Sequence, residues 1–217
     1  MTNFSNKVSL IWNIAELLRW SWKKYEYQDV VLPLTVLRRL DCVLESTKLD
    51  VLQMYNQIKW ELKDITPVLT NKSGYNFYNT SEFDFKRLLD DPKNIQQNLR
   101  DYIAWFSPNI QEILEKFNFE THLERLGSGN VLYKIIQEFN NIDLHIDEVQ
   151  NHQMWYIFEE LIRKFSEQSN ETAWEHFTPR EVIKLCCDLM FSTEKEELKK
   201  ENKLTKVFDC CCGTGGM

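Results

Sequence analysis

"VVLPLTVLRRLDCVLES", residues 30–46, places this chain among helical proteins. Leu37, Leu40 and Leu44 recur three and four residues apart, with charged side chains between them. That spacing puts the leucines on one face of a helix, so the stretch predicts an amphipathic helix with one buried side. Pro33 fits the first turn of this helix, where its missing N–H removes no hydrogen bond.

The same periodicity extends to both sides of this stretch. Further helices are predicted at 8–19, 51–64, 109–118, 130–140 and 151–168. "SEFDFKRLL" predicts a short helix capped by Ser81, with Asp84 as the reciprocal cap, and "DPKNIQQNLRDYIAWF" a helix with Pro92 at its start. "TPVLTNKSGYNFYNTS", rich in turn-forming residues, predicts a loop or a small hairpin.

The composition agrees with a mainly helical protein. Hydrophobic residues make up 43% of the 217 residues, whereas Gly and Pro number only six and five. No apolar run is long enough to span a bilayer and no signal peptide is recognised, so the protein is expected to be cytoplasmic, with no membrane partner and with reduced cysteines.

The net charge of −7 excludes a general positive field that would attract nucleic acid. Any contact with DNA must therefore come from a local basic patch or from a partner. Isolated basic pairs are usually solvated helix faces. The pairs that could touch phosphates are Arg38, Arg39, Lys86, Arg87, Arg163 and Lys164.

The pattern changes near the carboxyl terminus. After the polar segment "STEKEELKKENK", "KVFD" (206–209) predicts the first buried strand, and "CCCGTGG" then predicts a glycine-rich turn. The sequence thus predicts a mainly α fold, in which a multi-helix amino-terminal domain (1–170) precedes the first strand and turn of an α/β domain (171–217).

A second motif precedes this turn by about thirty residues. In "HFTPREV", Thr178 can cap a helix, Pro179 can occupy its first position, and Glu181 can complete a capping box. A structural role alone could explain this motif. The motif D-x-x-x-G-T-G-G is narrower, because its glycines let the backbone approach a ligand closely.

These residues carry a resemblance to a known family. "NETAWEHFTPREVIKL" together with "VFDCCCGTGGM" resembles the modification subunit of type I restriction-modification systems, a family of adenine-N6 DNA methyltransferases that use S-adenosylmethionine. "VVLPLTVLRRLDCVLE" and "FYNTSEFDFKRLLDDPKNIQQNLRDYI" are similar to the family's amino-terminal helical domain, so the resemblance covers essentially the whole chain. Trp155, Trp174, Cys210 and Cys211 depart from the residues usual in the family.

The resemblance implies an S-adenosylmethionine site in which both motifs hold the methionine end of the cofactor. Backbone N–H groups and small residues would border the carboxylate, and Phe177 could face the cationic sulfur. The implied cofactor-binding residues are Glu175, His176, Phe177, Thr178, Pro179, Arg180, Asp209, Gly213, Thr214, Gly215 and Gly216. The spacing of the cysteines does not suit zinc, so no metal site is expected.

The family's catalytic motif, Asn/Asp-Pro-Pro-aromatic, is absent from these 217 residues. No catalytic residue is therefore assigned, and this chain by itself is expected to be inactive and to bind the cofactor weakly or not at all. It is expected to be the amino-terminal part of a longer methyltransferase. The implied partners are DNA, the specificity and restriction subunits, and possibly a second modification subunit.

An alternative is a stand-alone helical interaction module with a vestigial cofactor turn. A longer reading frame that contains "NPPY" or "NPPF" would distinguish the two.

Overall fold

The fold is known from a computed structural model, which describes residues 2–19, 22–128, 131–169, 180–192 and 208. The chain divides into two compact units, Met1–Ser169 and Asn170–Met217. The described residues form eleven α-helices and one 3-10 turn. The mainly α fold that the sequence predicts is thereby confirmed, and none of the helices in these ranges is long and apolar enough to cross a membrane.

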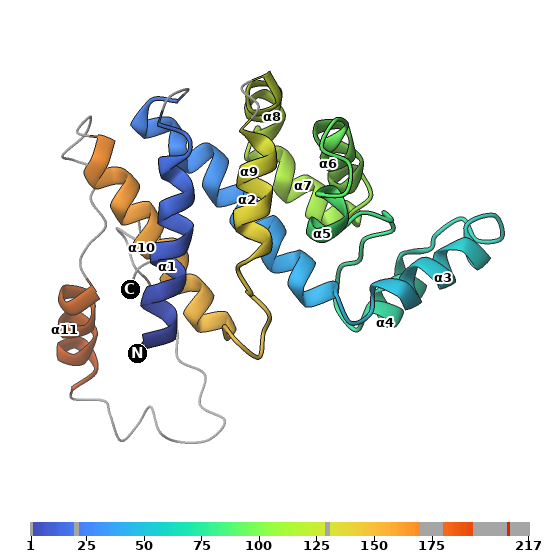
Figure 1. Cartoon of the computed structure of the whole chain (residues 1–217). Coiled ribbons are helices and arrows are strands. Elements are labelled where there is room, and N and C mark those ends of the chain that lie inside the picture. The colour runs from blue at the N-terminus through green and yellow to red at the C-terminus, as the bar shows by residue number, and fades with distance from the viewer. Residues whose placement is uncertain (1, 20–21, 129–130, 170–179, 193–207, 209–217) are drawn as a thin grey trace. The chain divides into compact units, whose positions relative to one another are not determined.

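The first unit consists of short and medium helices (Figure 1). They are α1 (Thr2–Glu16), the 3-10 turn η1 (Lys24–Glu26), α2 (Tyr27–Leu44), α3 (Lys48–Ile58), α4 (Thr66–Ser73), α5 (Phe85–Leu88), α6 (Ile95–Ala104), α7 (Pro108–Lys116), α8 (Phe119–Ser128), α9 (Leu132–Asn140) and α10 (Asn151–Ser169).

Helix α2 lies at the centre of this unit and contacts α1, α8, α9 and α10. Val30, Leu34 and Leu37 on α2 are completely buried. Burying one such side chain fully stabilises the fold by about 1.5–3 kcal/mol, so the apolar stripe of α2 is the main reason that its neighbours pack around it. The helix predicted from "VVLPLTVLRRLDCVLES" is therefore present and forms the core.

Helix α2 begins earlier than predicted, and Pro33 lies inside it rather than in its first turn. The chain enters α2 directly from η1, where a carboxylate oxygen of Glu26 accepts a hydrogen bond of 2.7 Å from the backbone N–H of Lys23. Pro33 is buried. Packing of the pyrrolidine ring in the core thus compensates for the hydrogen bond that the proline cannot donate.

Residues 66–81, predicted as a loop or hairpin, contain helix α4. Pro67 occupies the first turn of α4, Gly74 ends the helix in a left-handed conformation with φ 74°, and Leu69 is completely buried between them. The prediction was wrong because the helix shows no long apolar stripe. Its signals are a proline at the start and a glycine at the end.

The caps of α5 also differ from the prediction. Asp84, rather than Ser81, is the amino-terminal cap of α5, and its side chain accepts a hydrogen bond of 2.7 Å from the backbone N–H of Arg87. The Ser81 hydroxyl instead accepts a hydrogen bond from the N–H of Phe83 in the preceding turn. Both residues favour helix starts, so sequence alone could not distinguish between them.

Helix α8 was not predicted. Asn118, whose φ of 48° is left-handed, separates α7 from α8, so what reads as one helix followed by a loop is a pair of short helices. Asparagine adopts this conformation more readily than other residues with a side chain. Leu123 and Leu126 of α8 are completely buried in the core of the first unit.

The described part of the second unit is α11 (Arg180–Phe191), with Ser192 and Phe208. Phe208 is the one described residue of the strand predicted at "KVFD". It lies outside any helix or strand and is 89% exposed, which differs from the buried position predicted for it. The rest of the predicted strand and the glycine-rich turn lie outside the described residues.

Candidate functional site

The structure describes one of the eleven residues predicted to bind the cofactor. Arg180 is the first residue of α11, so a helix does follow the "FTP" segment. The other ten predicted residues lie outside the described ranges: Glu175, His176, Phe177, Thr178, Pro179, Asp209, Gly213, Thr214, Gly215 and Gly216. The approach of the "FTPR" segment to the glycine turn therefore stays a prediction.

Helix α11 carries an apolar face that is exposed in the structure. Val182, Leu185 and Leu189 lie on one side of the helix, together with Met190. A helix with this pattern usually buries its apolar face in a domain core, as expected of a helix near the start of an α/β domain.

Two of the predicted phosphate-binding residues have structural roles instead. Arg38 donates from Nε to the carbonyl oxygen of Ile142 at 2.9 Å and from Nη2 to that of Asn140 at 3.1 Å. Arg39 donates from Nη1 to the carbonyl oxygen of Val149 at 2.7 Å. Both guanidinium groups thus hold α2 against the segment between α9 and α10, and both side chains are half-buried.

Most of the other predicted basic residues also have partners within the unit. Arg87 donates to a backbone carbonyl in its own segment at 2.8 Å, Arg163 pairs with Glu160, and the ammonium of Lys164 lies 5.2 Å from the centre of the Trp12 ring. Contacts of this kind fix side chains on a helix surface and contribute about 1 kcal/mol or less each. These contacts give no reason to place a DNA-binding site at Arg87, Arg163 or Lys164.

A polar cluster lies where α2, α5 and α6 meet. The carboxylate of Asp41, which is 8% exposed, accepts hydrogen bonds from Arg38 Nη1 at 2.7 Å, from the Tyr102 hydroxyl at 3.0 Å and from the backbone N–H of Phe85 at 3.4 Å. Burial raises the pKa of Asp41, although Arg38 and Tyr102 act in the opposite direction. A buried acid with three donors is a structural group.

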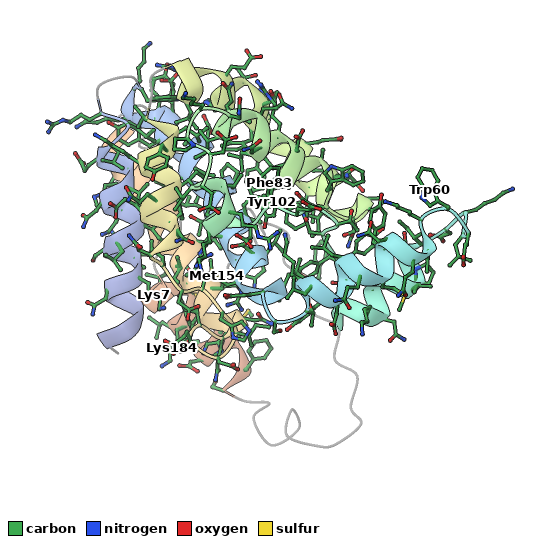
Figure 2. The ribbon with its side chains drawn as sticks, turned by 45° about the vertical axis from the view of Figure 1, so that its right-hand side comes forward. Lys7, Trp60, Phe83, Tyr102, Met154 and Lys184 are labelled. Carbon is green, nitrogen blue, oxygen red and sulfur yellow. The ribbon has the colours of Figure 1, made fainter. Side chains whose placement is uncertain are left out.

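Lys48, the first residue of α3, lies beside this cluster. Its ammonium donates to the carbonyl oxygen of Phe83 and lies 5.1 Å from the centre of the Tyr102 ring. Phe83 and Tyr102 are both labelled in Figure 2. Burial lowers the pKa of Lys48 to about 8, against the opposing effect of Asp41. In the part of the chain that the structure describes, no group of three or more His, Cys, Asp or Glu side chains could hold a metal ion.

Two surface tryptophans were not singled out as sites by the sequence. Trp155, on α10, is 73% exposed, and Trp60, after the end of α3, is 87% exposed. Most tryptophans in folded proteins bury their rings, since each ring carries a large apolar area. Neither residue has a sequence signal that separates it from a core tryptophan, so only the structure identifies them as surface groups.

Comparisons with known proteins match both parts of the chain. Residues 8–139 match the family model described as HsdM N-terminal domain, and residues 149–217 match the one described as N-6 DNA Methylase. A curated relative, the type I restriction enzyme MjaIX methylase subunit of Methanocaldococcus jannaschii, is 25% identical over 227 residues. The match covers 95% of this chain, and the chain spans 37% of the length of that relative.

Proposed function

This chain belongs to the HsdM N-terminal domain family and is an amino-terminal part of a type I modification methyltransferase subunit. We propose that it supplies DNA contacts, subunit contacts and one edge of an S-adenosylmethionine pocket. In the whole subunit the reaction would be methylation of adenine at N6. The partners would be DNA, the specificity and restriction subunits, and a second modification subunit.

The observation that carries this proposal is the order of the two family matches. The helical family covers 8–139, and the methylase family begins at 149 and includes both the "FTPR" segment and the glycine-rich turn. A helical domain followed directly by cofactor motifs supports a subunit in which the first unit makes contacts and the second begins the catalytic domain.

The residue types of the two motifs suit the methionine end of the cofactor. Gly213, Gly215 and Gly216 have no Cβ, so their backbone N–H groups could approach a carboxylate closely. Phe177 offers an aromatic face to a cation. When bound, the cofactor would supply the methyl group, and these residues would bind and orient it.

The pocket is tested by titrating S-adenosylmethionine into a modification subunit that carries this chain and a complete catalytic domain. Phe177→Ala and Gly215→Val should each weaken binding at least about tenfold, because one removes the aromatic face and the other obstructs the backbone approach. Leu49→Ala, an exposed change in the first unit, should have no effect. Unchanged affinity in both pocket variants would contradict the proposal.

The 217-residue chain by itself should neither methylate DNA nor bind the cofactor tightly. The catalytic Asn/Asp-Pro-Pro-aromatic motif is absent from it. Losing two hydrogen bonds between charged protein groups and the cofactor, together with the contacts to the adenine of the cofactor, would weaken cofactor binding about a thousandfold. Low-micromolar binding by this chain in isothermal titration would show that its pocket is complete or is completed by a second copy.

The segment "RWSWKKYEY" (19–27) is the part of the first unit that we assign to the DNA backbone. Arg19, Lys23 and Lys24 are exposed between α1 and α2, and Tyr25 lies next to Lys23, with the ammonium 5.5 Å from its ring centre. In a chain of net charge −7, this local cluster of cations is the kind of patch that DNA contact would require.

This assignment predicts a specific salt dependence. Replacing Lys23 and Lys24 by alanine should reduce the slope of log affinity against log salt concentration by about two, because each phosphate contact contributes about one. Lys59→Ala with Lys63→Ala, which removes two exposed lysines elsewhere, should leave the slope unchanged. Fluorescence anisotropy with duplex DNA measures both, and equal slopes in the two double variants would exclude this segment.

A further inference from the structure

The segment that connects α9 to α10, here named the joint (141–150), lies where the two family matches meet (Figure 1). The helical match ends at 139 and the methylase match begins at 149. Boundaries between domains usually fall in exposed linkers that few contacts cross. The joint differs from such a linker, because Ile142, Leu144 and Val149 are buried in the main core of the first unit.

Arg39 on α2 ties the joint to the first residue of α10. Its Nη1 donates to the carbonyl oxygens of Leu144 and Val149, the latter at 2.7 Å, and its Nη2 donates to Oδ1 of Asn151 at 2.9 Å. A guanidinium can serve several acceptors at once, because its N–H groups lie in one plane at fixed angles. One side chain of α2 thus fixes both the end of the joint and the start of α10.

Lys7 and Arg38 hold the first part of the joint in the same way. The ammonium of Lys7, on α1, donates to the carbonyl oxygen of Asp143, and this side chain is only 8% exposed. Arg38 donates to the carbonyl oxygen of Ile142 at 2.9 Å. Buried cations and buried carbonyl oxygens each require such partners, so loosening the joint would leave both kinds of group unsatisfied.

Helix α10 is also fixed along its length, since it packs against α1, α2 and η1. Ile157 and Leu161 on α10 are completely buried. The turn η1 lies within 19–27, the segment that we assign to the DNA backbone. The proposed DNA contact and the first helix of the methylase match therefore belong to one packed body within the first unit.

We propose that the joint is a rigid coupling rather than a hinge, and that Arg39 is a positioning residue for the methylation reaction. This inference rests on the proposed function, in which 19–27 contacts DNA and the methylase match begins the catalytic domain. Arg39 acts through α10 and touches neither DNA nor cofactor in this scheme. A misplacement of about 1 Å can lower a reaction rate about a hundredfold, so a loosened joint reduces turnover.

The rigidity of the joint is tested by amide hydrogen exchange in the 217-residue chain. Arg39→Met keeps a long side chain and removes the guanidinium, so the amides of Val149 and Met154 should exchange at least about tenfold faster. Both are protected in the structure, at 2.8 Å from the carbonyl oxygen of His145 and at 3.0 Å from that of Gln150.

The matched control is Arg100→Met. Arg100 is also half-buried and pairs with Glu120 in the same unit, away from the joint. This variant should leave exchange in the joint within about twofold of the wild-type rate, because it removes an ion pair that does not hold α10.

The positioning role is tested with a modification subunit that carries this chain and a complete catalytic domain, assembled with its partners. Arg39→Met should lower kcat for methyl transfer to duplex DNA at least about fivefold, while KM for DNA and the affinity for S-adenosylmethionine stay within about twofold. Arg39→Lys keeps a cation that can reach one carbonyl oxygen, so it should recover part of kcat. Arg100→Met should leave kcat unchanged.

Wild-type exchange in the joint of Arg39→Met would overturn the rigid coupling, and faster exchange with a wild-type kcat would overturn the positioning role. Should Arg39→Met fail to fold, Arg39→Lys decides by the same two measurements. The titration of S-adenosylmethionine into Phe177→Ala does not depend on the joint. A failure of the proposed cofactor pocket and a failure of the coupling are therefore distinguishable.

Discussion

The Asp41 carboxylate shows how much the first unit depends on a few buried polar groups. Arg38 and Tyr102 bring a cation and a hydroxyl to a carboxylate that water hardly reaches. Removing one partner from such a group costs more than an ordinary hydrogen bond contributes, because the remaining charge is left incompletely solvated. This cluster therefore acts as a constraint on how α2, α5 and α6 pack.

Tyr102→Phe should lower the free energy of unfolding by about 1–3 kcal/mol, since it removes one donor from the buried carboxylate and leaves the ring in place. Tyr133→Phe is a suitable control because Tyr133 is half-buried on α9 and belongs to no such cluster, so its change should stay within about 0.5 kcal/mol. Urea unfolding at pH 7 measures both. Equal stabilities for the two variants would show that the hydroxyl of Tyr102 contributes nothing.

The lowered pKa of Lys48 predicts the sign of a pH dependence in the stability of the first unit. Its pKa is lowered from 10.5 to about 8 in the folded chain, so above pH 8 the folded state binds fewer protons at this site than the unfolded state. Stability relative to a Lys48→Met variant should therefore rise with pH between about 8 and 10.5, by on the order of 1–3 kcal/mol. Urea unfolding of both proteins across this window tests the sign. A difference that stays constant or falls would contradict the lowered pKa.

Helices α4 and α5 are determined by their ends rather than by an apolar stripe. Gly74 illustrates this at the end of α4, where its N–H donates to the carbonyl oxygens of Thr70 and Asn71 while its φ is 74°. A Cβ placed on Gly74 would meet no atom within 4 Å. The requirement for glycine is therefore conformational and not steric.

Gly74→Ala should destabilise α4 by about 1 kcal/mol, because an L-residue with a Cβ is strained in the left-handed region. Gly74→Asn should cost less, since asparagine tolerates that region. Amide hydrogen exchange in α4 reports the local change directly. If alanine and asparagine have the same effect, the left-handed cap is not what limits the helix.

Sequence periodicity predicts those helices that bury a long stripe, such as α2, α9 and α10, and it fails where a helix is short. Helix α8 contains leucines at suitable spacing, but Gly127 near its end and Gly129 after it indicate a loop when no structure is available. The roles of Arg38 and Arg39 could not be predicted, because their carbonyl partners lie about a hundred residues away in sequence. Of the predicted cofactor-binding residues, only Arg180, at the start of α11, is described. The arrangement of the others is therefore tested by the cofactor titration of the pocket variants.

The two family matches do not coincide with the two structural units. The methylase match begins at 149, yet α10 packs against α1, α2 and η1 within the first unit. Ile157 and Leu161 on α10 are completely buried, and Phe165 lies 5.2 Å from Trp12 between ring centres. Helix α10 thus belongs both to the first structural unit and to the part of the sequence that matches the methylase family, so it links the two.

A fragment of residues 1–169 should therefore fold cooperatively, whereas 1–148 should not. Removing α10 exposes the apolar faces of α1 and α2, and the loss of several completely buried side chains exceeds the stability of a typical domain of this size. Thermal melts followed by circular dichroism compare the two fragments. The domain boundary predicted near residue 170 would be wrong if 1–148 melted as sharply and at the same temperature as 1–169.

Helices α3 and α4 pack on each other around a small apolar cluster of Val51, Leu69 and Tyr78, and this has a consequence for how far their outer end extends. An α-helix rises 1.5 Å per residue, so seven residues added to each of α3 and α4 would carry Trp60 about 10 Å further from the rest of the first unit. Such a change would not alter any side chain in the main core of the first unit, because α3 and α4 pack around their own cluster. The distance between Trp60 and the central helix α2 can thus be changed without changing the fold of the rest of the first unit.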